Sequence, residues 1–238
     1  MVNFISKILD TCEVVKMKGE ALVKEEIYHI MSKSIGDSPI FNNETEYQRM
    51  RGLLSYYQYE DPPVKFSKFS LHIKKENPGK KENLKKGEKL VEIIAYSIMP
   101  THFHLILKQN KEKGISIFIK NILNSYTRYF NIRHNRKGPL WEGRFKRVKL
   151  ETNEQLLHLT RYIHLEPVIK KLVAKPEDWL FSSYREYLAE VKERLCNFEG
   201  FLEINPSYKE FVEDRIAYPR ELEKIKNLII EPLSLPTS

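Results

Sequence analysis

The sequence is poor in the residues that cross-link a fold or anchor it in a membrane. Its two cysteines, Cys12 and Cys196, have no metal-type spacing, so neither a disulfide framework nor a cysteine metal site is expected. No apolar run approaches the ~18 residues that cross a bilayer. The apolar residues at the start of the chain are interrupted by Lys7, Asp10 and Glu13, which argues against a signal peptide. These absences predict a cytoplasmic protein without a membrane segment.

The length and composition indicate one folded domain with extensions. The chain has 238 residues, of which 41% are hydrophobic and 11% aromatic, and this composition favours a packed core over disorder. We expect a short N-terminal extension over 1–22, a main domain over 23–190 and a helical tail over 191–238.

Positive charge is concentrated in one part of the chain. The net charge is +8, and the segment 128–149 contains five arginines and three lysines against Glu142 alone. Aromatic residues interleave with these cations, which is typical of a surface that binds a nucleic acid. A second basic run, 74–89, mixes lysine with glutamate and is interpreted as a solvated loop. The candidate DNA-binding residues are Arg128, Arg133, Arg136, Lys137, Trp141, Arg144, Lys146 and Arg147.

The hydrophobic patterns alternate between strand and helix periods. Strands are predicted over 26–35, 65–73, 91–98 and from 102 to about 108, and a short basic-apolar alternation covers 144–150. Helices are predicted over 43–57, 114–134, 152–167 and from 176 onward. This order predicts an α+β fold, a ferredoxin-like antiparallel sheet with helices packed on it and short helical extensions at both termini.

The stretch "PTHFHLIL", residues 100–107, places two histidines on an otherwise apolar strand. Residues two apart on a strand face the same way, so His102 and His104 share one face. They are either hydrogen-bonded core histidines or a pair of ligands for a divalent ion. The helix over 152–167 carries Tyr162 and Glu166 one turn apart, which brings a phenol and a carboxylate to one face. Metal-assisted attack by a tyrosine needs these groups.

Three blocks of the sequence resemble a known family. The spans "AYSIMPTHFHLIL", "SYTRYFNIRHNRKGPLWEGRFKRVKL" and "LLHLTRYIHLEPV" are similar, in order, to the single-tyrosine HUH transposases, of the REP-associated tyrosine transposase branch. The stretch "PEDWLFSSYREYL" also resembles that branch, so the likeness covers roughly 25–190. It implies a ferredoxin-like fold and cleavage of single-stranded or hairpin DNA by a tyrosine that stays joined to the 5′ phosphate.

The resemblance also assigns roles to particular residues. His102 and His104 match the histidines that hold Mg²⁺ or Mn²⁺, and Tyr162 matches the nucleophile. Glu166 stands where the family more often has Asn, which leaves its role as third metal ligand open. Tyr126 and Tyr129 are the alternative nucleophiles, although their helical spacing favours a packing role.

Two other functions remain open at this point. A nicking enzyme of replication or conjugation would use the same chemistry, and a domesticated protein would bind DNA hairpins without cutting them. Related enzymes often act as dimers, so a homodimer is an alternative to a monomer.

Overall fold

Four strands form one antiparallel sheet in the computed structural model, which describes residues 21–62, 64–69, 87–201, 208–214 and 216. The strand order is β2-β3-β1-β4, so β1 and β3 are central and β2 and β4 lie at the edges. The strands are β1 (Ile27–Lys33), β2 (Val91–Ile98), β3 (His102–Gln109) and β4 (Lys146–Leu150). The predicted bounds of β2 are confirmed, and the predicted strand over 26–35 is shortened by a 3₁₀ turn, η1 (Ile35–Asp37).

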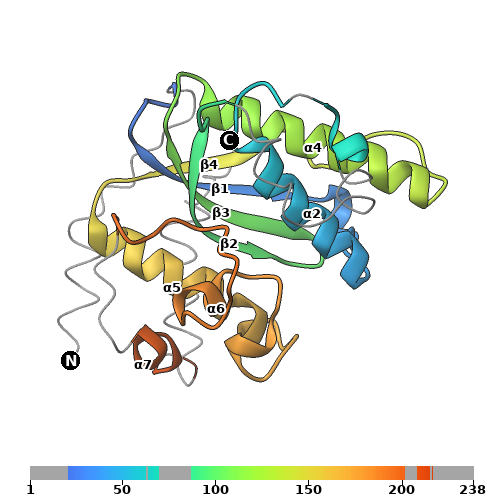
Figure 1. Ribbon diagram of the computed structural model, residues 1–238. Helices are drawn as coiled ribbons and strands as arrows, with labels where there is room; N and C mark the ends of the chain where they lie inside the picture. Colours follow the sequence, from blue (N-terminus) through green and yellow to red (C-terminus); the bar gives the residue numbers. More distant parts are fainter. Residues whose placement is uncertain (1–20, 63, 70–86, 202–207, 215, 217–238) are drawn as a thin grey trace, which may run out of the picture.

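Helices cover both faces of this sheet (Figure 1). On one side lie α2 (Glu44–Tyr57) and α4 (Gly114–Arg133), which pack against each other. On the other side α5 (Asn153–Ile169) packs against β2 and β4, with α6 (Tyr184–Tyr187) and α7 (Tyr208–Glu213) beyond it. The order β1-α2-β2-β3-α4-β4 with this strand arrangement confirms the predicted ferredoxin-like α+β fold.

Local sequence signals explain where the helices begin. Asn43 caps α2 by accepting a hydrogen bond from the N–H of Glu46, and Thr152 caps α5 by accepting one from Gln155. The first residue of α4 is Gly114, and a Cβ there would lie 2.3 Å from the carbonyl oxygen of Leu90. A side chain at this position would therefore separate α4 from the loop that precedes β2.

Three secondary-structure predictions are wrong in part. Instead of a strand over 65–73, residues 66–69 form a helical turn in which the N–H groups of Lys68 and Phe69 bond to the carbonyl of Lys65; 70–73 lie outside the described residues. The predicted end of α5 at Pro167 is also wrong, because the helix runs to Ile169. Proline lacks only its own N–H, and Lys170 N–H still bonds to the carbonyl of Glu166.

The third error concerns the segment from Pro176. A single helix is predicted, but the chain forms a 3₁₀ turn, η4 (Pro176–Asp178), an extended stretch and then α6. The extended stretch bonds to the edge of β2, where Ile98 N–H reaches the carbonyl of Phe181 and Ser183 N–H reaches that of Tyr96, each at 2.9 Å. These sheet-like bonds outweigh the local helical pattern.

The described parts of the chain contain no helix long and apolar enough to span a membrane. The predicted extension over 1–22 and the lysine-rich run over 74–89 lie mostly outside the described residues.

Candidate active site

The site begins at the turn from β2 into β3, which fixes the direction of two histidines. Met99 N–H bonds to the carbonyl of His102 at 2.8 Å, so β3 starts directly after the Pro100 turn. From there the side chains alternate: Phe103 is fully buried on the side of α2 and α4, whereas His102 and His104 face α5. The alternation that the sequence predicts is therefore present.

Helix α5 brings a carboxylate to the two imidazoles. Glu166 Oε1 lies 3.1 Å from His102 Nε2, and Glu166 Oε2 lies 3.1 Å from His104 Nε2. The side chains of His104 and Glu166 are 2% and 3% exposed, whereas that of His102 is 15% exposed, so the cluster opens to solvent past His102. We call these three residues the HHE triad.

Electrostatics keep the carboxylate of the HHE triad ionised. Burial alone would raise the pKa of Glu166, but the attraction of His104 and the hydrogen bond from His102 bring that pKa below its ordinary value. Glu166 is therefore a carboxylate at neutral pH, which is the form that binds a cation.

The donor set of the HHE triad fits a divalent ion. One ligand atom from each residue lies within 4.8 Å of the others, the one such group of three His, Cys, Asp or Glu side chains among the described residues. Ligands at ~2.1 Å from an octahedral ion stand about 3 Å apart when adjacent, close to the 3.1 Å separations here. Glu166 Oε2 is buried, and the polar atom beside it is His104 Nε2, at 3.1 Å.

Tyr162 lies beside the HHE triad on the same helix. Its ring centroid is 6.4 Å from that of His104, and the two rings are nearly perpendicular. Tyr162 precedes Glu166 by one turn, so α5 presents both to the same region. Tyr162 is 2% exposed, whereas the side chain of His102 is 15% exposed.

The alternative tyrosines belong to the opposite side of the sheet. Tyr126 is fully buried in α4, where its hydroxyl donates to the carbonyl of Ile40 at 2.6 Å. Tyr129, on the same helix, packs against Tyr126 and under the guanidinium of Arg49. Neither is near the HHE triad, in line with the packing role that their spacing favours.

The predicted DNA-binding residues divide into two groups. Arg128, Arg133, Arg136 and Lys137 are exposed on the last turns of α4 and the loop after it, and Arg136 also holds that loop by donating to Asn131 Oδ1 and to the carbonyl of Pro139. Arg144, Lys146 and Arg147 lie on the approach to β4 and within it. Lys146 is opposite Met31 and shares the face of the HHE triad, whereas Arg147 is opposite Ile30 and faces the other way.

Trp141 is not available for stacking on a base, which corrects the sequence interpretation. Its side chain is 8% exposed and packs against Phe41, Phe103 and Tyr126. Its indole N–H donates to Thr127 Oγ1 at 3.0 Å. In the sequence, an aromatic residue within a basic segment suggests a surface on which bases stack. In the structure, Trp141 fills the core beneath that segment.

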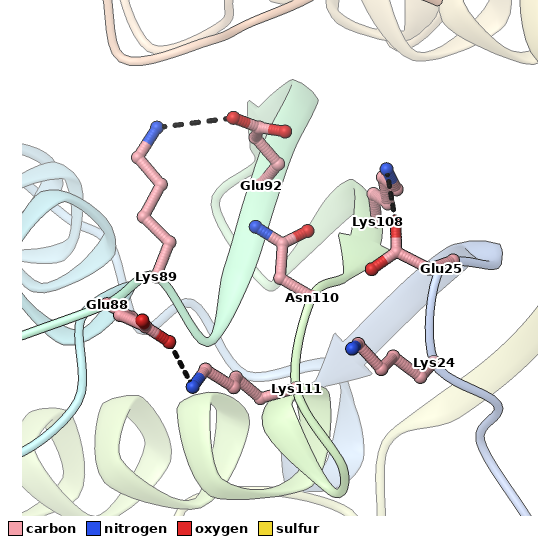
Figure 2. Close-up of a pocket in the computed structure, with 8 residues that line it drawn as sticks. All are labelled: Lys24, Glu25, Glu88, Lys89, Glu92, Lys108, Asn110 and Lys111. Atoms are coloured by element: carbon pink, nitrogen blue, oxygen red, sulfur yellow. Dashed lines mark hydrogen bonds and ion pairs between the residues drawn. The ribbon is translucent and has the colours of Figure 1, made fainter.

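Two clefts differ in their relation to the triad. One of about 410 Å³ lies around the C-terminal end of β3, remote from His102 at its start. Figure 2 shows that Lys89, Lys108 and Lys111 at this cleft pair with glutamates. Lys108 pairs with Glu25 and Lys111 with Glu88, so its cations are largely compensated. The second, of about 260 Å³, lies along β1 at Met31 and Lys33, which pair with His104 and His102; we call it the β1–β4 groove. Its lining is Met31, Ser32, Lys33, Glu142, Gly143, Arg144 and Lys146.

The middle of the chain, which contains the site, matches a known family model. The profile described as "Transposase IS200 like" matches residues 68–166, a span that contains all of the HHE triad and Tyr162. This part of the chain is similar to the IS200-like transposases. A search of curated proteins found no match.

Solved structures of low identity also resemble this chain. A REP-associated tyrosine transposase bound to a REP hairpin is 17% identical, with a TM-score of 0.47, over 79% of this chain and 97% of that one. A candidate transposase from Deinococcus radiodurans R1 is 16% identical, with a TM-score of 0.34, over 61% and 94%. A tRNA(His) guanylyltransferase from Saccharomyces cerevisiae is 11% identical, with a TM-score of 0.34, over 87% and 79%.

One residue beside the HHE triad is not predicted from the sequence. His29 on β1 lies with its Nε2 2.9 Å from His104 Nδ1, and both rings are buried. The two histidines are 75 residues apart in the chain, and only the pairing of β1 with β3 brings them together. The one available signal is that "IYHIMSK" puts a polar ring on a strand that is otherwise buried.

Proposed function

We propose that this chain is a metal-dependent endonuclease and strand transferase for single-stranded DNA, a transposase that acts through a covalent 5′-phosphotyrosine intermediate. The match of residues 68–166 to the IS200-like transposase model supports the general activity. The observation that carries the mechanism is the convergence of the HHE triad beside Tyr162.

The HHE triad is proposed to hold Mg²⁺ or Mn²⁺ through His102 Nε2, His104 Nε2 and a Glu166 oxygen. When bound, such an ion supplies Lewis-acid polarisation of a phosphate oxygen. Imidazole and carboxylate together suit Mn²⁺, and carboxylate with water suits Mg²⁺. The Glu at position 166 adds negative charge to the site, where the resembled family more often has a neutral Asn.

Tyr162 is proposed as the nucleophile. Its phenolic oxygen would form a bond to the scissile phosphorus and release its proton to solvent. The bond from phosphorus to the 3′ oxygen breaks, and that oxygen takes up a proton to become a 3′ hydroxyl. The enzyme then carries the 5′ phosphate as a tyrosyl phosphodiester, which a DNA 3′ hydroxyl can attack in the reverse sense. The bond energy is kept, so strand transfer needs no external energy source.

The β1–β4 groove gives the DNA strand a path to Tyr162. It is lined by Lys33, Arg144 and Lys146, and it borders the HHE triad because Lys33 and Met31 pair with His102 and His104. The exposed cations at the end of α4 extend the basic surface, and cations of this kind bind phosphates without reading sequence. The sequence blocks resemble the REP-associated branch, so we propose hairpin-forming repetitive elements as the substrate.

Formation of a covalent adduct tests this function. The wild-type protein should form a protein–DNA adduct with a labelled hairpin oligonucleotide in Mn²⁺, and EDTA should prevent it. Tyr162→Phe should bind the hairpin but form no adduct, and Tyr129→Phe, the matched control on α4, should form one.

The outcomes separate the candidate functions. Mass spectrometry that finds the nucleotide on a residue other than Tyr162 would contradict the assignment. Hairpin binding by the wild-type protein without any adduct would instead favour the non-cleaving hairpin-binding protein.

A further inference from the structure

His29 occupies the centre of the sheet directly behind the HHE triad. It lies on β1 opposite Ile106 on one side and Val148 on the other, and its side chain is 2% exposed. Because residues two apart on β1 share a face, His29 projects to the same side as Met31, which is opposite His104. The rings of His29 and His104 stack at 5.1 Å between centroids, with 13° between their planes.

The contact between the two rings is directional. The separation of 2.9 Å between His29 Nε2 and His104 Nδ1 is that of a hydrogen bond, so one nitrogen donates and the other accepts. A neutral imidazole has one N–H, so Nε2 carries the hydrogen when Nδ1 does not, and has a free lone pair when Nδ1 does. If His104 Nδ1 donates, its Nε2 has a lone pair directed toward Glu166. If it accepts, Nε2 carries a hydrogen and cannot be a metal ligand.

Without His29, the tautomer of His104 that carries its hydrogen on Nε2 would be favoured in the metal-free protein. His104 Nε2 lies 3.1 Å from the carboxylate oxygen Glu166 Oε2, and an N–H at that position is attracted to it. An acceptor behind the ring of His104, in the position of His29 Nε2, would oppose this attraction. His102, the less buried of the two histidines, also has a polar neighbour at this atom, because its Nδ1 lies 3.0 Å from Thr101 Oγ1.

We propose that His29 is a positioning residue that accepts a hydrogen bond from His104 Nδ1–H and so sets the Nε2 lone pair of His104 for metal binding before any ion arrives. This inference rests on the proposed metal site. Partners of this kind hold the ring orientation and tautomer of a metal-ligating histidine, and their loss typically weakens metal affinity by about 10–100-fold.

Two substitutions separate hydrogen bonding from packing. His29→Gln keeps an acceptor near the position of Nε2 but removes the ring, whereas His29→Phe keeps a stacked ring but removes the acceptor. We expect His29→Phe to weaken Mn²⁺ binding, measured by Mn²⁺ electron paramagnetic resonance, by about 10–100-fold. His29→Gln should stay close to the wild type. His134→Gln, which changes a histidine paired with a glutamate on the other side of the sheet, is the control and should bind Mn²⁺ normally.

A second measurement does not depend on the metal. Long-range ¹H–¹⁵N NMR spectra of the imidazoles in metal-free protein should show the Nδ1–H tautomer for His104 in the wild type and a shift toward Nε2–H in His29→Phe. An Nε2–H tautomer of His104 in the wild-type protein would overturn the inference. It would also be overturned if His29→Phe kept the wild-type affinity for Mn²⁺ and His29→Gln lost it. A wild-type protein with the Nδ1–H tautomer but no Mn²⁺ binding would refute the metal site while supporting the role of His29.

Discussion

Two buried glutamates on opposite sides of the sheet have different partners. Glu46, on the side of α2 and α4, is fully buried, and its Oε1 lies 2.6 Å from His134 Nε2. Its Oε2 accepts from the backbone N–H of Asn42 at 2.7 Å and from the Asn42 side chain at 3.1 Å. Glu166, on the side of α5, has the Nε2 atoms of two histidines for neighbours.

The difference indicates which site is structural and which is chemical. Glu46 is the third residue of α2 and reaches back to the N–H before the capping Asn43, as the acidic residue of a helix cap does. The backbone and amide N–H groups around Glu46 have no lone pair on nitrogen that could bind a metal ion. The imidazoles around Glu166 can bind one, because each can present a lone pair in place of an N–H. Glu46 and Glu166 are both carboxylates in contact with a histidine. The other groups around each carboxylate therefore distinguish the structural site from the chemical one.

Removal of a histidine from each cluster should give the largest contrast. His102→Ala or His104→Ala should reduce cleavage of a hairpin oligonucleotide by about a thousandfold or more, since Lewis-acid stabilisation is worth several kcal/mol. Binding of the hairpin should persist, because these residues do not form the basic surface. His134→Ala should cleave normally, and cleavage by both of the first two variants at the wild-type rate would remove the metal assignment.

Metal-dependent stability should distinguish the two glutamates. Mn²⁺ at about 100 times its dissociation constant should add about 2.7 kcal/mol to the free energy of unfolding of the wild-type protein. Glu166→Gln should lose this increment, and Glu46→Gln should keep it. Urea unfolding with and without Mn²⁺ measures both, and an equal increment in the two variants would mean that the ion binds elsewhere.

The pH dependence of stability should reveal the role of Glu46. Burial opposes ionisation of Glu46, but the hydrogen bonds from Asn42 and His134 lower its pKa below the ordinary value of 4.5. A lowered carboxyl pKa stabilises the fold above the unfolded-state pKa, and this contribution is lost as the pH falls through the folded-state value. Glu46→Gln should therefore cost about 1.5–3 kcal/mol at pH 7, the usual range for a hydrogen bond to a charged group.

That cost should shrink as the pH is lowered below about 4.5, because the wild-type carboxyl then becomes neutral as well. Unfolding by urea at a series of pH values measures the gap between the two proteins. A gap that is constant from pH 7 to pH 3 would contradict the proposed ionisation of Glu46.

The smallest expected effect is on the salt dependence of DNA binding, when neighbouring cations on the two faces of β4 are replaced. Lys146 shares the face of the HHE triad, and Arg147 faces the other way. Each phosphate contact to single-stranded DNA contributes about 0.7 to the slope of log affinity against log salt. Lys146→Ala should reduce this slope by about that amount, and Arg147→Ala should reduce it less. Equal slopes for both variants would place the DNA surface away from the β1–β4 groove.

Short-range signals in the sequence account for much of the fold. The β-branched run over Val91–Ile98 defines a strand, the period of two puts His102 and His104 on one face, and a capping threonine starts α5. Contacts between distant segments explain what is missed. His134 meets Glu46 across 88 residues and His29 meets His104 across 75, and neither pair leaves a local pattern.

The errors have the same origin. The segment from Pro176 has a helical pattern, but the edge of β2 offers it hydrogen bonds that the pattern does not record. Trp141 lies in a basic segment, and only the arrangement of α4 against β3 shows that the ring fills the core. The family resemblance assigns functional roles to Tyr162 and to the HHE triad, and these roles stay predictions.

The cover on the edge of β2 limits how two copies of this protein can associate. An exposed edge strand invites a second chain to continue the sheet. Here Tyr187 Oη donates to the carbonyl of Ile94, and the Trp179 indole donates to that of Ile98. Residues 181–183 bond to the backbone between these two points. A homodimer that extends the sheet through this edge is therefore blocked, and any symmetric pair of active sites must be assembled through another surface.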